Sequence, residues 1–352
     1  MVDDRPVVIA SDDAVLDEIL RLAAAVGCEV ERLSDLGAAR DRWASAPLVL
    51  VDEAAVAGAG PALPRRAGVL LVCAADPEPA TWQRAFALGV EQVVALPEGE
   101  AGLATALADV AEGPGAPGGR VVAALGGRGG AGASVLAAAL AVGACRAGDD
   151  ALLVDCDPLG GGADVVFGLE CATGLRWPAL RVRSGRVSMA ELASALPGRR
   201  YGGGMLSVLS CDRDGPGPEP EALAAVVEAG RRAGRTVVCD LPRRFDSAGR
   251  EALGHADLVV VVLPAEVRAC VAAKRVVEQI GDRLDRVRVL VRGPAGAVLT
   301  GAEVADAVGV PLLGWMRPER GLTRMLEHGE FDPKPGGPLG RAARTMLAAL
   351  TT

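Results

Sequence analysis

The chain has 352 residues, half of them apolar, and its 45 acidic and 37 basic side chains give a net charge of −8. This composition excludes a disordered protein, and the length predicts two α/β domains, or at most three, each able to bury a core. No apolar run approaches the roughly 18 residues that span a membrane, and the acidic first residues lack the cationic front of a signal peptide. We therefore expect a cytoplasmic protein.

Residues 1–112 alternate short β-rich runs with helical patterns, which predicts five βα units in one doubly wound sheet. The expected strands cover residues 7–10, 29–33, 48–51, 69–73 and 92–95, and the expected helices cover residues 14–26, 36–44, 79–88 and 101–111. Residues 113–119 contain only Gly, Pro and Ala, so this segment is predicted to be a linker between two domains.

Residues 120–352 form the second predicted domain, where the same alternation starts again. The expected elements are a strand at 120–125, a glycine-rich loop, a helix at 134–146 and a strand at 151–156, followed by strands at 205–209, 236–239, 258–263, 287–291 and 310–314 with helices between them. This order predicts a second doubly wound, mostly parallel sheet. Residues 171–204 are expected to be irregular, and residues 212–220 to form a flexible loop.

The glycine-rich loop has the spacing of a phosphate-binding Walker A loop, Gly127-x-x-x-x-Gly132-x-Ser134, between a strand and a helix. Such a loop cradles phosphates with main-chain N–H groups at the positive end of the following helix. The alternative is a loop that only turns the chain, which the strand–loop–helix context disfavours. The candidate nucleotide-binding residues are Gly127, Arg128, Gly129, Gly130, Ala131, Gly132, Ala133, Ser134 and Val135.

One position of this loop departs from the Walker pattern, because Ala133 stands where a lysine would bridge the β- and γ-phosphates. The only lysines of the chain are Lys274 and Lys334, so a replacement lysine would have to be one of them; Arg128 is the only charged residue within the loop. Losing one fixed donor to a developing negative charge costs about 10²–10³ in rate. We expect binding of ATP and Mg²⁺ to be weak and hydrolysis to be weak or absent.

Carboxylates follow two later strands. Asp155 and Asp157 end the apolar run 151–156, two residues apart and so on one side of an extended chain, and Asp240 ends the run 236–239. Ligands bind at this carboxyl edge of α/β sheets. Ser134, Asp155 and Asp240 are therefore candidates for holding Mg²⁺, directly or through water, and Asp157 for positioning the attacking water. The alternative for each carboxylate is a helix cap or turn residue.

The segment Arg128-Gly-Gly-Ala-Gly-Ala-Ser134 resembles the loop of the deviant-Walker MinD/ParA family, which reads KGGxGK followed by Ser or Thr. The resemblance covers residues 119–330 and implies a mostly parallel sheet with adenine nucleotide sandwiched in a homodimer. Arg128 then replaces the lysine that crosses to the partner subunit, Asp157 matches the switch aspartate, and Asp240 the Walker B residue. Where the family usually has Asn-Arg at the adenine, this chain has Val291-Arg292.

Further motifs, at residues 240–243, 291–294, 311–319 and 325–329, resemble the septum site-determining branch of this family, beside the pilus-positioning proteins CpaE and TadZ. These relatives carry a receiver-like N-terminal domain, which residues 1–112 resemble. Asp52 stands where receivers accept phosphate, with Asp12 and Asp13 as candidate metal contacts, but Leu96 precedes Pro97 where receivers place lysine. This favours a pseudo-receiver used for docking over a phosphorylated switch.

Apolar residues of the last helical pattern fall on one face: Leu339, Ala342, Ala343, Met346, Leu347 and Leu350. This short helix resembles the membrane-targeting tail of MinD only loosely, and docking on its own domain is favoured over peripheral contact with the membrane. Recruitment to the septum or a cell pole, at the inner face of the membrane, is the localisation that the resemblance implies.

The leading hypothesis is a regulatory protein that influences septum placement by binding division or pilus-assembly proteins. The first alternative is an active ATPase switch in division or pilus assembly, in which Arg128 or a partner's arginine compensates for Ala133. The second is a ParA-like module that partitions DNA and binds it through Arg231, Arg232 and Arg235. Because the second half of the chain is only modestly basic, the sequence carries no strong nucleic-acid signal.

Overall fold

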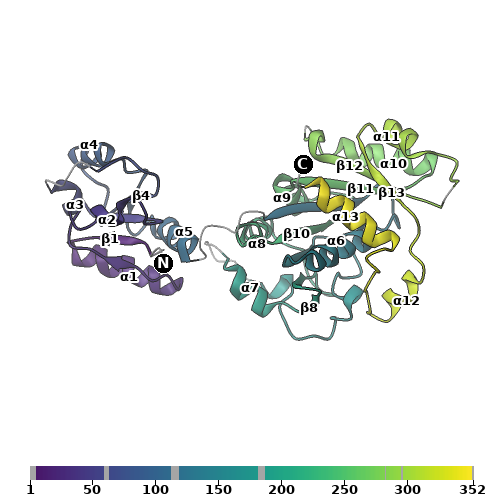
Figure 1. Cartoon of the computed structure of the whole chain (residues 1–352), viewed down its shortest axis with the longest axis horizontal. Helices are drawn as coiled ribbons and strands as arrows, with labels where there is room; N and C mark the ends of the chain where they lie inside the picture. The colour runs from purple at the N-terminus through teal and green to yellow at the C-terminus, as the bar shows by residue number, and fades with distance from the viewer. Residues whose placement is uncertain are drawn as a thin grey trace. The chain divides into compact units, whose positions relative to one another are not determined.

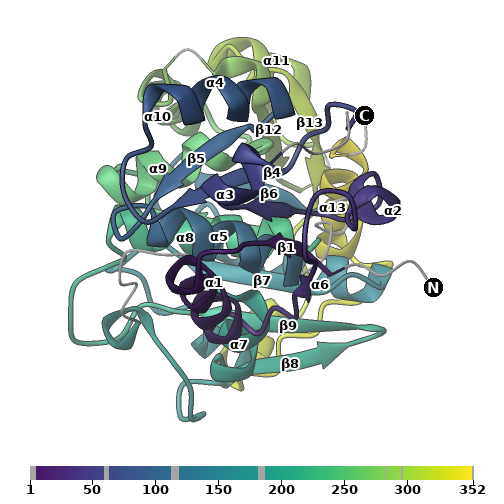
Figure 2. The same cartoon turned by 90° about the vertical axis from the view of Figure 1, so that its left-hand side faces the viewer.

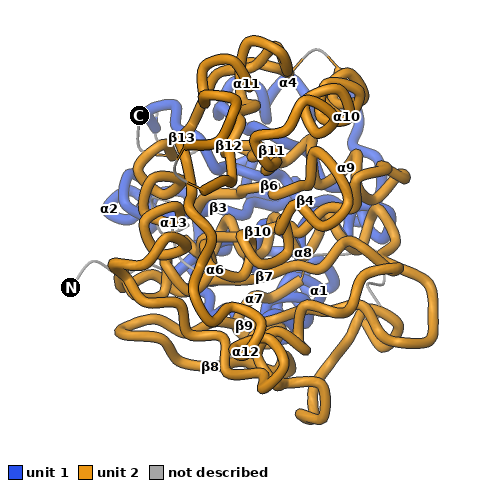
Figure 3. Tube along the Cα trace, turned by 90° about the vertical axis from the view of Figure 1, so that its right-hand side faces the viewer, with its two compact units in different colours: residues 1–115, 183–186 blue, residues 116–182, 187–352 orange. Residues whose placement is uncertain are grey.

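The computed structural model describes residues 5–58, 63–111, 119–180, 187–281, 283–294 and 296–350. They fall into two compact units, coloured differently in Figure 3. The N-terminal unit contains residues 5–58 and 63–111, and the C-terminal unit contains all the described residues from Gly119 onward. The predicted linker, 113–119, lies outside the described residues except for Gly119.

The N-terminal unit is a five-stranded parallel sheet in the order β2-β1-β3-β4-β5, which confirms the predicted α/β architecture. Its strands are β1 (Val7–Ile9), β2 (Glu31–Arg32), β3 (Val49–Val51), β4 (Val69–Cys73) and β5 (Gln92–Ala95), and its helices are α1 (Asp13–Ala25), α2 (Arg40–Trp43), α3 (Glu53–Ala57), α4 (Pro79–Leu88) and α5 (Glu100–Ala111). Helices α1 and α5 pack on one face of the sheet, and α2, α3 and α4 on the other.

The helix predicted at 36–44 is wrong in its first half. Only Arg40–Trp43 is α-helical; residues 36–39 form turns, in which the Asp35 carboxylate accepts a hydrogen bond from Ala38 N at 2.9 Å. The strand predicted at 29–33 shrinks to Glu31–Arg32 at the edge of the sheet. Helix α3 is absent from the predicted elements.

The C-terminal unit is an eight-stranded sheet in the order β13-β12-β11-β6-β10-β7-β9-β8, whose strands are labelled in Figure 3. Its strands are β6 (Arg120–Gly126), β7 (Ala151–Asp155), β8 (Gly198–Tyr201), β9 (Gly204–Leu209), β10 (Thr236–Leu241), β11 (Leu258–Pro264), β12 (Val287–Arg292) and β13 (Leu312–Met316). All neighbouring pairs are parallel except β8 and β9. The predicted mostly parallel, doubly wound sheet is confirmed.

Helices cover both faces of this sheet. They are α6 (Ala133–Ala147), α7 (Met189–Ala195), α8 (Pro220–Arg232), α9 (Ser247–His255), α10 (Val267–Glu278), α11 (Gly301–Val308), α12 (Leu322–Glu327) and α13 (Pro338–Ala349), with 3₁₀ turns η1 (Val165–Phe167), η2 (Trp177–Ala179) and η3 (Leu284–Arg286). Apolar residues of α8, α9, α10 and α11 fill one core, and those of α6 and α13 fill the other.

The prediction that residues 171–204 are irregular is wrong for residues 187–204, while residues 181–186 lie outside the described part of the chain. Residues 187–204 contain α7, whose N-cap residue Ser188 accepts a hydrogen bond from Glu191 N at 3.4 Å. They also contain β8, which pairs antiparallel with β9 (Figure 2). Gly202, with a φ of +59°, belongs to the tight turn between β8 and β9, so the glycines there connect two strands instead of interrupting structure. The predicted strand 310–314 lies two residues later, at Leu312–Met316.

The last helix, α13, docks on its own unit. Its buried residues are Leu339, Gly340, Ala342, Ala343 and Met346, and the helix crosses α6 so closely that a Cβ added at Gly143 would lie 2.8 Å from the Cβ of Ala343 (Figure 1). The apolar face that resembled a membrane-targeting tail is therefore covered by α6. Within the described part of the chain, no helix combines the length and apolar character needed to cross a bilayer.

Candidate nucleotide-binding site

The candidate phosphate loop joins the central strand β6 to α6 at the carboxyl edge of the sheet. Gly127 N donates to the Val262 carbonyl of β11 at 2.9 Å, which fixes the start of the loop, and Gly130 and Gly132 take φ values of +70° and +100°. Side chains rarely adopt these values, so the two glycines allow the chain to curl before Ala133 begins the helix. The sequence motif is therefore in the strand–loop–helix setting that a phosphate-binding loop requires.

Ser134 and Asp240 meet at this edge. Ser134 lies in the first turn of α6, and Asp240 lies in β10, which pairs with β6 on one side and with β7 on the other. The pKa of Asp240 is raised to about 7, chiefly by burial; the Ser134 side chain opposes this rise, and the nearby Asp155 and Asp157 carboxylates add to it. A hydroxyl and a buried carboxylate placed together in this way suit a hard cation such as Mg²⁺.

Asp155 ends β7 directly beside Asp240, with which it is paired in the sheet. Burial raises its pKa, although four donors oppose this effect. Its carboxylate accepts hydrogen bonds from Ala163 N (3.0 Å), Asp157 N (3.1 Å), Cys211 N (3.2 Å) and Ser210 Oγ (3.0 Å). Asp155 therefore holds together the segments that follow β7 and β9, besides lying close to Asp240.

Asp157 lies just beyond the strand that carries Asp155. β7 ends at Asp155, and the chain turns: the Asp157 carboxylate accepts from Leu159 N at 3.1 Å, and its carbonyl accepts from Gly160 N at 2.9 Å. Asp157 still acts on the Asp240 carboxyl electrostatically. It is half-buried in a turn next to the site.

Arg128, the charged residue of the loop, is engaged within its own chain. Its guanidinium forms an ion pair with Glu266 at 3.2 Å and donates to the Gly129 carbonyl at 3.2 Å. Its Nε is buried without a hydrogen-bond partner among the described residues. Glu266 is the residue before α10, so this ion pair ties the phosphate loop to that helix.

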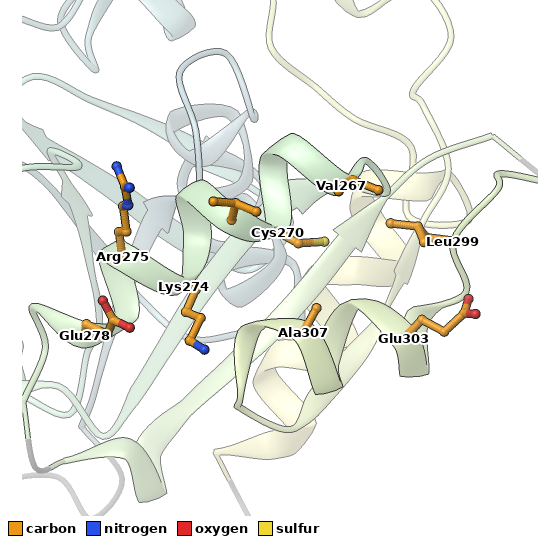
Figure 4. Close-up of a pocket in the computed structure, with 9 residues that line it drawn as sticks. Val267, Cys270, Lys274, Arg275, Glu278, Leu299, Glu303 and Ala307 are labelled. Carbon is orange, nitrogen blue, oxygen red and sulfur yellow. The ribbon is translucent and has the colours of Figure 1, made fainter.

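Neither lysine of the chain replaces the one missing at Ala133. Lys274 lines a groove of about 330 Å³ between α10 and α11, together with Glu303 and Ala307 (Figure 4). It is Ala273, the residue before it, that faces the loop at Gly127. Lys334 follows Pro333, whose carbonyl accepts a hydrogen bond from Arg146 at the far end of α6, about 20 Å along the helix from Ala133.

A buried polar network behind Asp155 has no signal in the sequence. Ser210 Oγ bridges Asp155 and the fully buried Asp164, at 3.0 and 3.2 Å. Arg176 Nε and Arg213 Nη1 form ion pairs with Asp164 at 2.8 and 3.0 Å. The loop that carries Arg213 also contacts Pro158 near Gly217. The predicted flexible segment 212–220 thus packs over the turn after β7.

The three arginines proposed to bind DNA make contacts inside the C-terminal unit. Arg231 forms an ion pair with Asp257 at 3.2 Å, Arg235 forms one with Asp150 at 3.3 Å, and Arg232 donates to the Val187 carbonyl at 3.4 Å. Arginines that are held by intramolecular partners are poor candidates for a phosphate-binding surface.

In the N-terminal unit, the Asp52 carboxylate is used by the fold. It is buried and accepts hydrogen bonds from Ser11 N (2.5 Å), Asp12 N (2.8 Å) and Ala55 N (2.7 Å), the last as the cap of α3. Asp12 caps α1 by accepting from Ala14 N at 2.8 Å. The candidate phosphate acceptor and one of its candidate metal contacts are therefore both engaged in helix capping.

Comparison with known proteins adds relatives for each unit. Residues 9–118 match the family described as the Rv3660c-like, CheY-like N-terminal domain. The uncharacterized protein Rv3660c of Mycobacterium tuberculosis (strain ATCC 25618 / H37Rv) is 44% identical over 344 residues, which cover 97% of this chain and 96% of that protein.

Solved structures resemble the C-terminal unit. The cell division ATPase MinD of Pyrococcus furiosus has a TM-score of 0.54 and 17% identity over 66% of this chain and 99% of that chain. The MinC:MinD cell division protein complex of Aquifex aeolicus has a TM-score of 0.52 and 22% identity, covering 65% of this chain and 96% of that chain. A ParA family ATPase of Chlorobium tepidum TLS has a TM-score of 0.52 and 16% identity, covering 66% of this chain and 98% of that chain. The chain therefore belongs to the Rv3660c-like family, and it joins a CheY-like N-terminal domain to a domain of the MinD/ParA P-loop NTPase fold.

Proposed function

We propose that this protein is a regulator of septum placement whose C-terminal domain binds ATP with Mg²⁺ and hydrolyses it weakly or not at all. The observation that carries the proposal is the glycine loop between β6 and α6, with Ala133 in the lysine position, beside the buried and adjacent carboxylates of Asp155 and Asp240. The main-chain amides of the loop and the start of α6 would hold the phosphates, and Ser134 and Asp240 the metal.

Weak turnover follows from what the loop lacks. Ala133 has neither charge nor reach, and the removal of one fixed donor from a transition state of this kind costs about 10²–10³ in rate. Asp157, the proposed position for orienting water, lies in a turn beside the site and not on the strand. The missing lysine therefore lowers the rate of hydrolysis more than it lowers the affinity for nucleotide. The bound nucleotide then acts as a regulatory ligand and not as a substrate.

The assignment to division draws support from the MinD fold of the C-terminal domain and from the motifs that resemble the septum site-determining branch. The CheY-like domain is the proposed docking module for division or pilus-assembly proteins, because Asp52 is engaged by main-chain amides. A nucleotide-dependent homodimer is part of the proposal; to form it in the manner of its relatives, Arg128 must leave Glu266.

Isothermal titration of the full chain with ATP–Mg²⁺ and with ADP tests the binding step. We expect measurable affinity that is lost in Ser134→Ala when Mg²⁺ is present, with the exposed Ser45→Ala as the matched control. Phosphate release should be near background in the wild type and rise in Ala133→Lys. Rapid, magnesium-dependent turnover by the unmodified protein that disappears in Asp157→Ala contradicts the proposal and favours an active ATPase switch.

The cellular role is tested separately. A fluorescent fusion should concentrate at the septum or a cell pole, and overproduction or depletion should change the distribution of cell lengths. Light scattering after size-exclusion chromatography, with and without ATP, tests the homodimer. An even distribution through the cell with unchanged cell lengths contradicts the division role and leaves the nucleotide site untouched.

A further inference from the structure

A second arginine, Arg292, reaches the phosphate loop from a strand two positions away in the sheet. Arg292 is the last residue of β12 and pairs with Pro264 of β11, while Gly126, the last residue of β6, pairs with Val262 of β11. Arg292 therefore lies about two residues beyond the end of β6, at the carboxyl edge where the loop begins. An arginine side chain is long enough to cross the intervening strand.

The guanidinium of Arg292 lies against the last glycine of the loop. Its Nη1 is 2.9 Å from the position that a Cβ would take at Gly132, whose φ of +100° itself requires glycine. Gly132 immediately precedes Ala133, the residue in the lysine position. The charged end of Arg292 is thus next to the point where the loop lacks its own cation.

Arg292 is half-buried, and its side chain forms no hydrogen bond or ion pair with any residue in the described ranges. Its neighbours differ in this respect. Arg128 pairs with Glu266, and Arg288, on the same strand, donates to the carbonyls of Asp285 and Val287 at 2.6 and 2.9 Å. A guanidinium carries five donors in a fork that fits phosphate oxygens, so an unpaired one beside a phosphate loop is suited to an anionic ligand.

We propose that Arg292 supplies to the bound phosphates the positive charge that Ala133 does not. The inference rests on the proposed nucleotide site and identifies the Arg292 guanidinium as the positively charged group that contacts the phosphates there. It differs from what the MinD/ParA resemblance implies for this position, which is recognition of adenine. The guanidinium lies at the phosphate loop, so the part of the nucleotide that it would contact is the phosphate chain.

The experiment compares two probes on the full chain with Mg²⁺: a fluorescent N-methylanthraniloyl ATP, and inorganic pyrophosphate, which has no base, as its competitor. The variants are Arg292→Ala, Arg292→Lys, Ala133→Lys, the double variant Ala133→Lys/Arg292→Ala, and Arg288→Ala as the matched control from the same strand. Thermal melting of each variant checks that its fold is retained.

We expect Arg292→Ala to weaken both probes about tenfold or more, the loss typical of a hydrogen-bonded charge. Arg292→Lys and Arg288→Ala should stay within about threefold of the wild type, and the double variant should recover affinity because a lysine again faces the phosphates. Unchanged binding of both probes by Arg292→Ala overturns the inference, and so does a loss confined to the ATP analogue, which would assign Arg292 to the base.

The same binding experiment gives a different result if the proposed function itself is wrong. If the folded wild type binds neither probe and Ala133→Lys binds both, the native site does not hold nucleotide, and Arg292 does not replace the lysine. If the wild type and Arg292→Ala bind both probes with the same affinity, nucleotide binding stands and the inference alone is wrong.

Discussion

Gly127 of the phosphate loop and Ala273 of α10 are in such close contact that a Cβ added at Gly127 would lie 2.7 Å from the Cβ of Ala273. Ala273 is buried, and the same added Cβ would lie 3.1 Å from the Cβ of Leu263, so there is no room for a side chain at Gly127. The loop is therefore positioned by α10 as well as by the strand before it.

Gly127→Ala should consequently displace the loop and cost about 1–3 kcal/mol, as overpacked sites do. Gly129→Ala is the matched control, because a Cβ at Gly129 meets nothing within 4 Å. Calorimetric melting of both variants measures the difference. Equal melting temperatures would mean that the loop yields to the added methyl group.

The pKa of Asp240, raised by burial to about 7, makes the stability of the metal-free protein depend on pH. An aspartate in the unfolded chain has a pKa of about 3.9, so between about pH 4 and pH 7 the folded state binds a proton that the unfolded state has released. The contribution of Asp240 therefore falls as pH rises through this window, and its cost is complete above pH 7.

Asp240→Asn should remove this cost. We expect the variant to equal the wild type near pH 4 and to exceed it at pH 8 by as much as about 3–4 kcal/mol, measured by urea unfolding in EDTA. Adding Mg²⁺ and ATP should stabilise the wild type but not the variant. A pH-independent difference between the two proteins would contradict the assignment.

Asp52→Ala should destabilise the N-terminal domain by about 1–3 kcal/mol, because three main-chain N–H groups lose their acceptor and α3 loses its cap. Asp17→Ala, on the exposed face of α1, is the control. Incubation with acetyl phosphate and Mg²⁺, followed by intact mass measurement, should leave the wild type unmodified. A gain of one phosphoryl group that is absent from Asp52→Asn would identify a working receiver.

Arg176→Ala should cost about 3 kcal/mol or more, because Asp164 is fully buried and Arg176 is its more buried partner. Arg213→Ala should cost less, since the Arg213 side chain is 42% exposed and water can replace part of its interaction. Chemical denaturation of the two variants gives the comparison. The opposite ranking would place the main partner of Asp164 in the loop after β9.

Two glycines in helices should respond oppositely to alanine. Gly254→Ala in α9 adds a methyl group in open space and should stabilise by up to about 1 kcal/mol through helix propensity. Gly143→Ala in α6 should destabilise despite the same propensity, because its Cβ would meet Ala343 of α13 at 2.8 Å. Stabilisation by Gly143→Ala would show that α13 is not firmly docked.

Both sheets could be predicted from the sequence because buried parallel strands appear as unbroken apolar runs, such as Leu258–Pro264. Short elements could not. α3 spans only Glu53–Ala57, and β8 contains Gly-Arg-Arg-Tyr, whose strand conformation comes from pairing with β9 and not from its composition.

The candidate site, like the fold, could be predicted from the sequence only in part. The motif and the parallel strands predicted Ser134 and Asp240 at one sheet edge, where the structure has them together, although their roles remain predictions. Ser210 and Asp164 could not be predicted, because they join Asp155 through loops. The approach of Arg292 to Gly132 depends on the order of strands in the sheet, which the residues alone do not give.

The sheet edge that brings Ser134, Asp155 and Asp240 together draws on three strand–loop junctions far apart in the chain. A molecule bound there would hold the central strands of the domain together, because the three junctions can separate only if β6, β7 and β10 separate from one another. Ligand protection should therefore appear in hydrogen exchange at β6, β7 and β10 together, and not as a local ordering of the glycine loop.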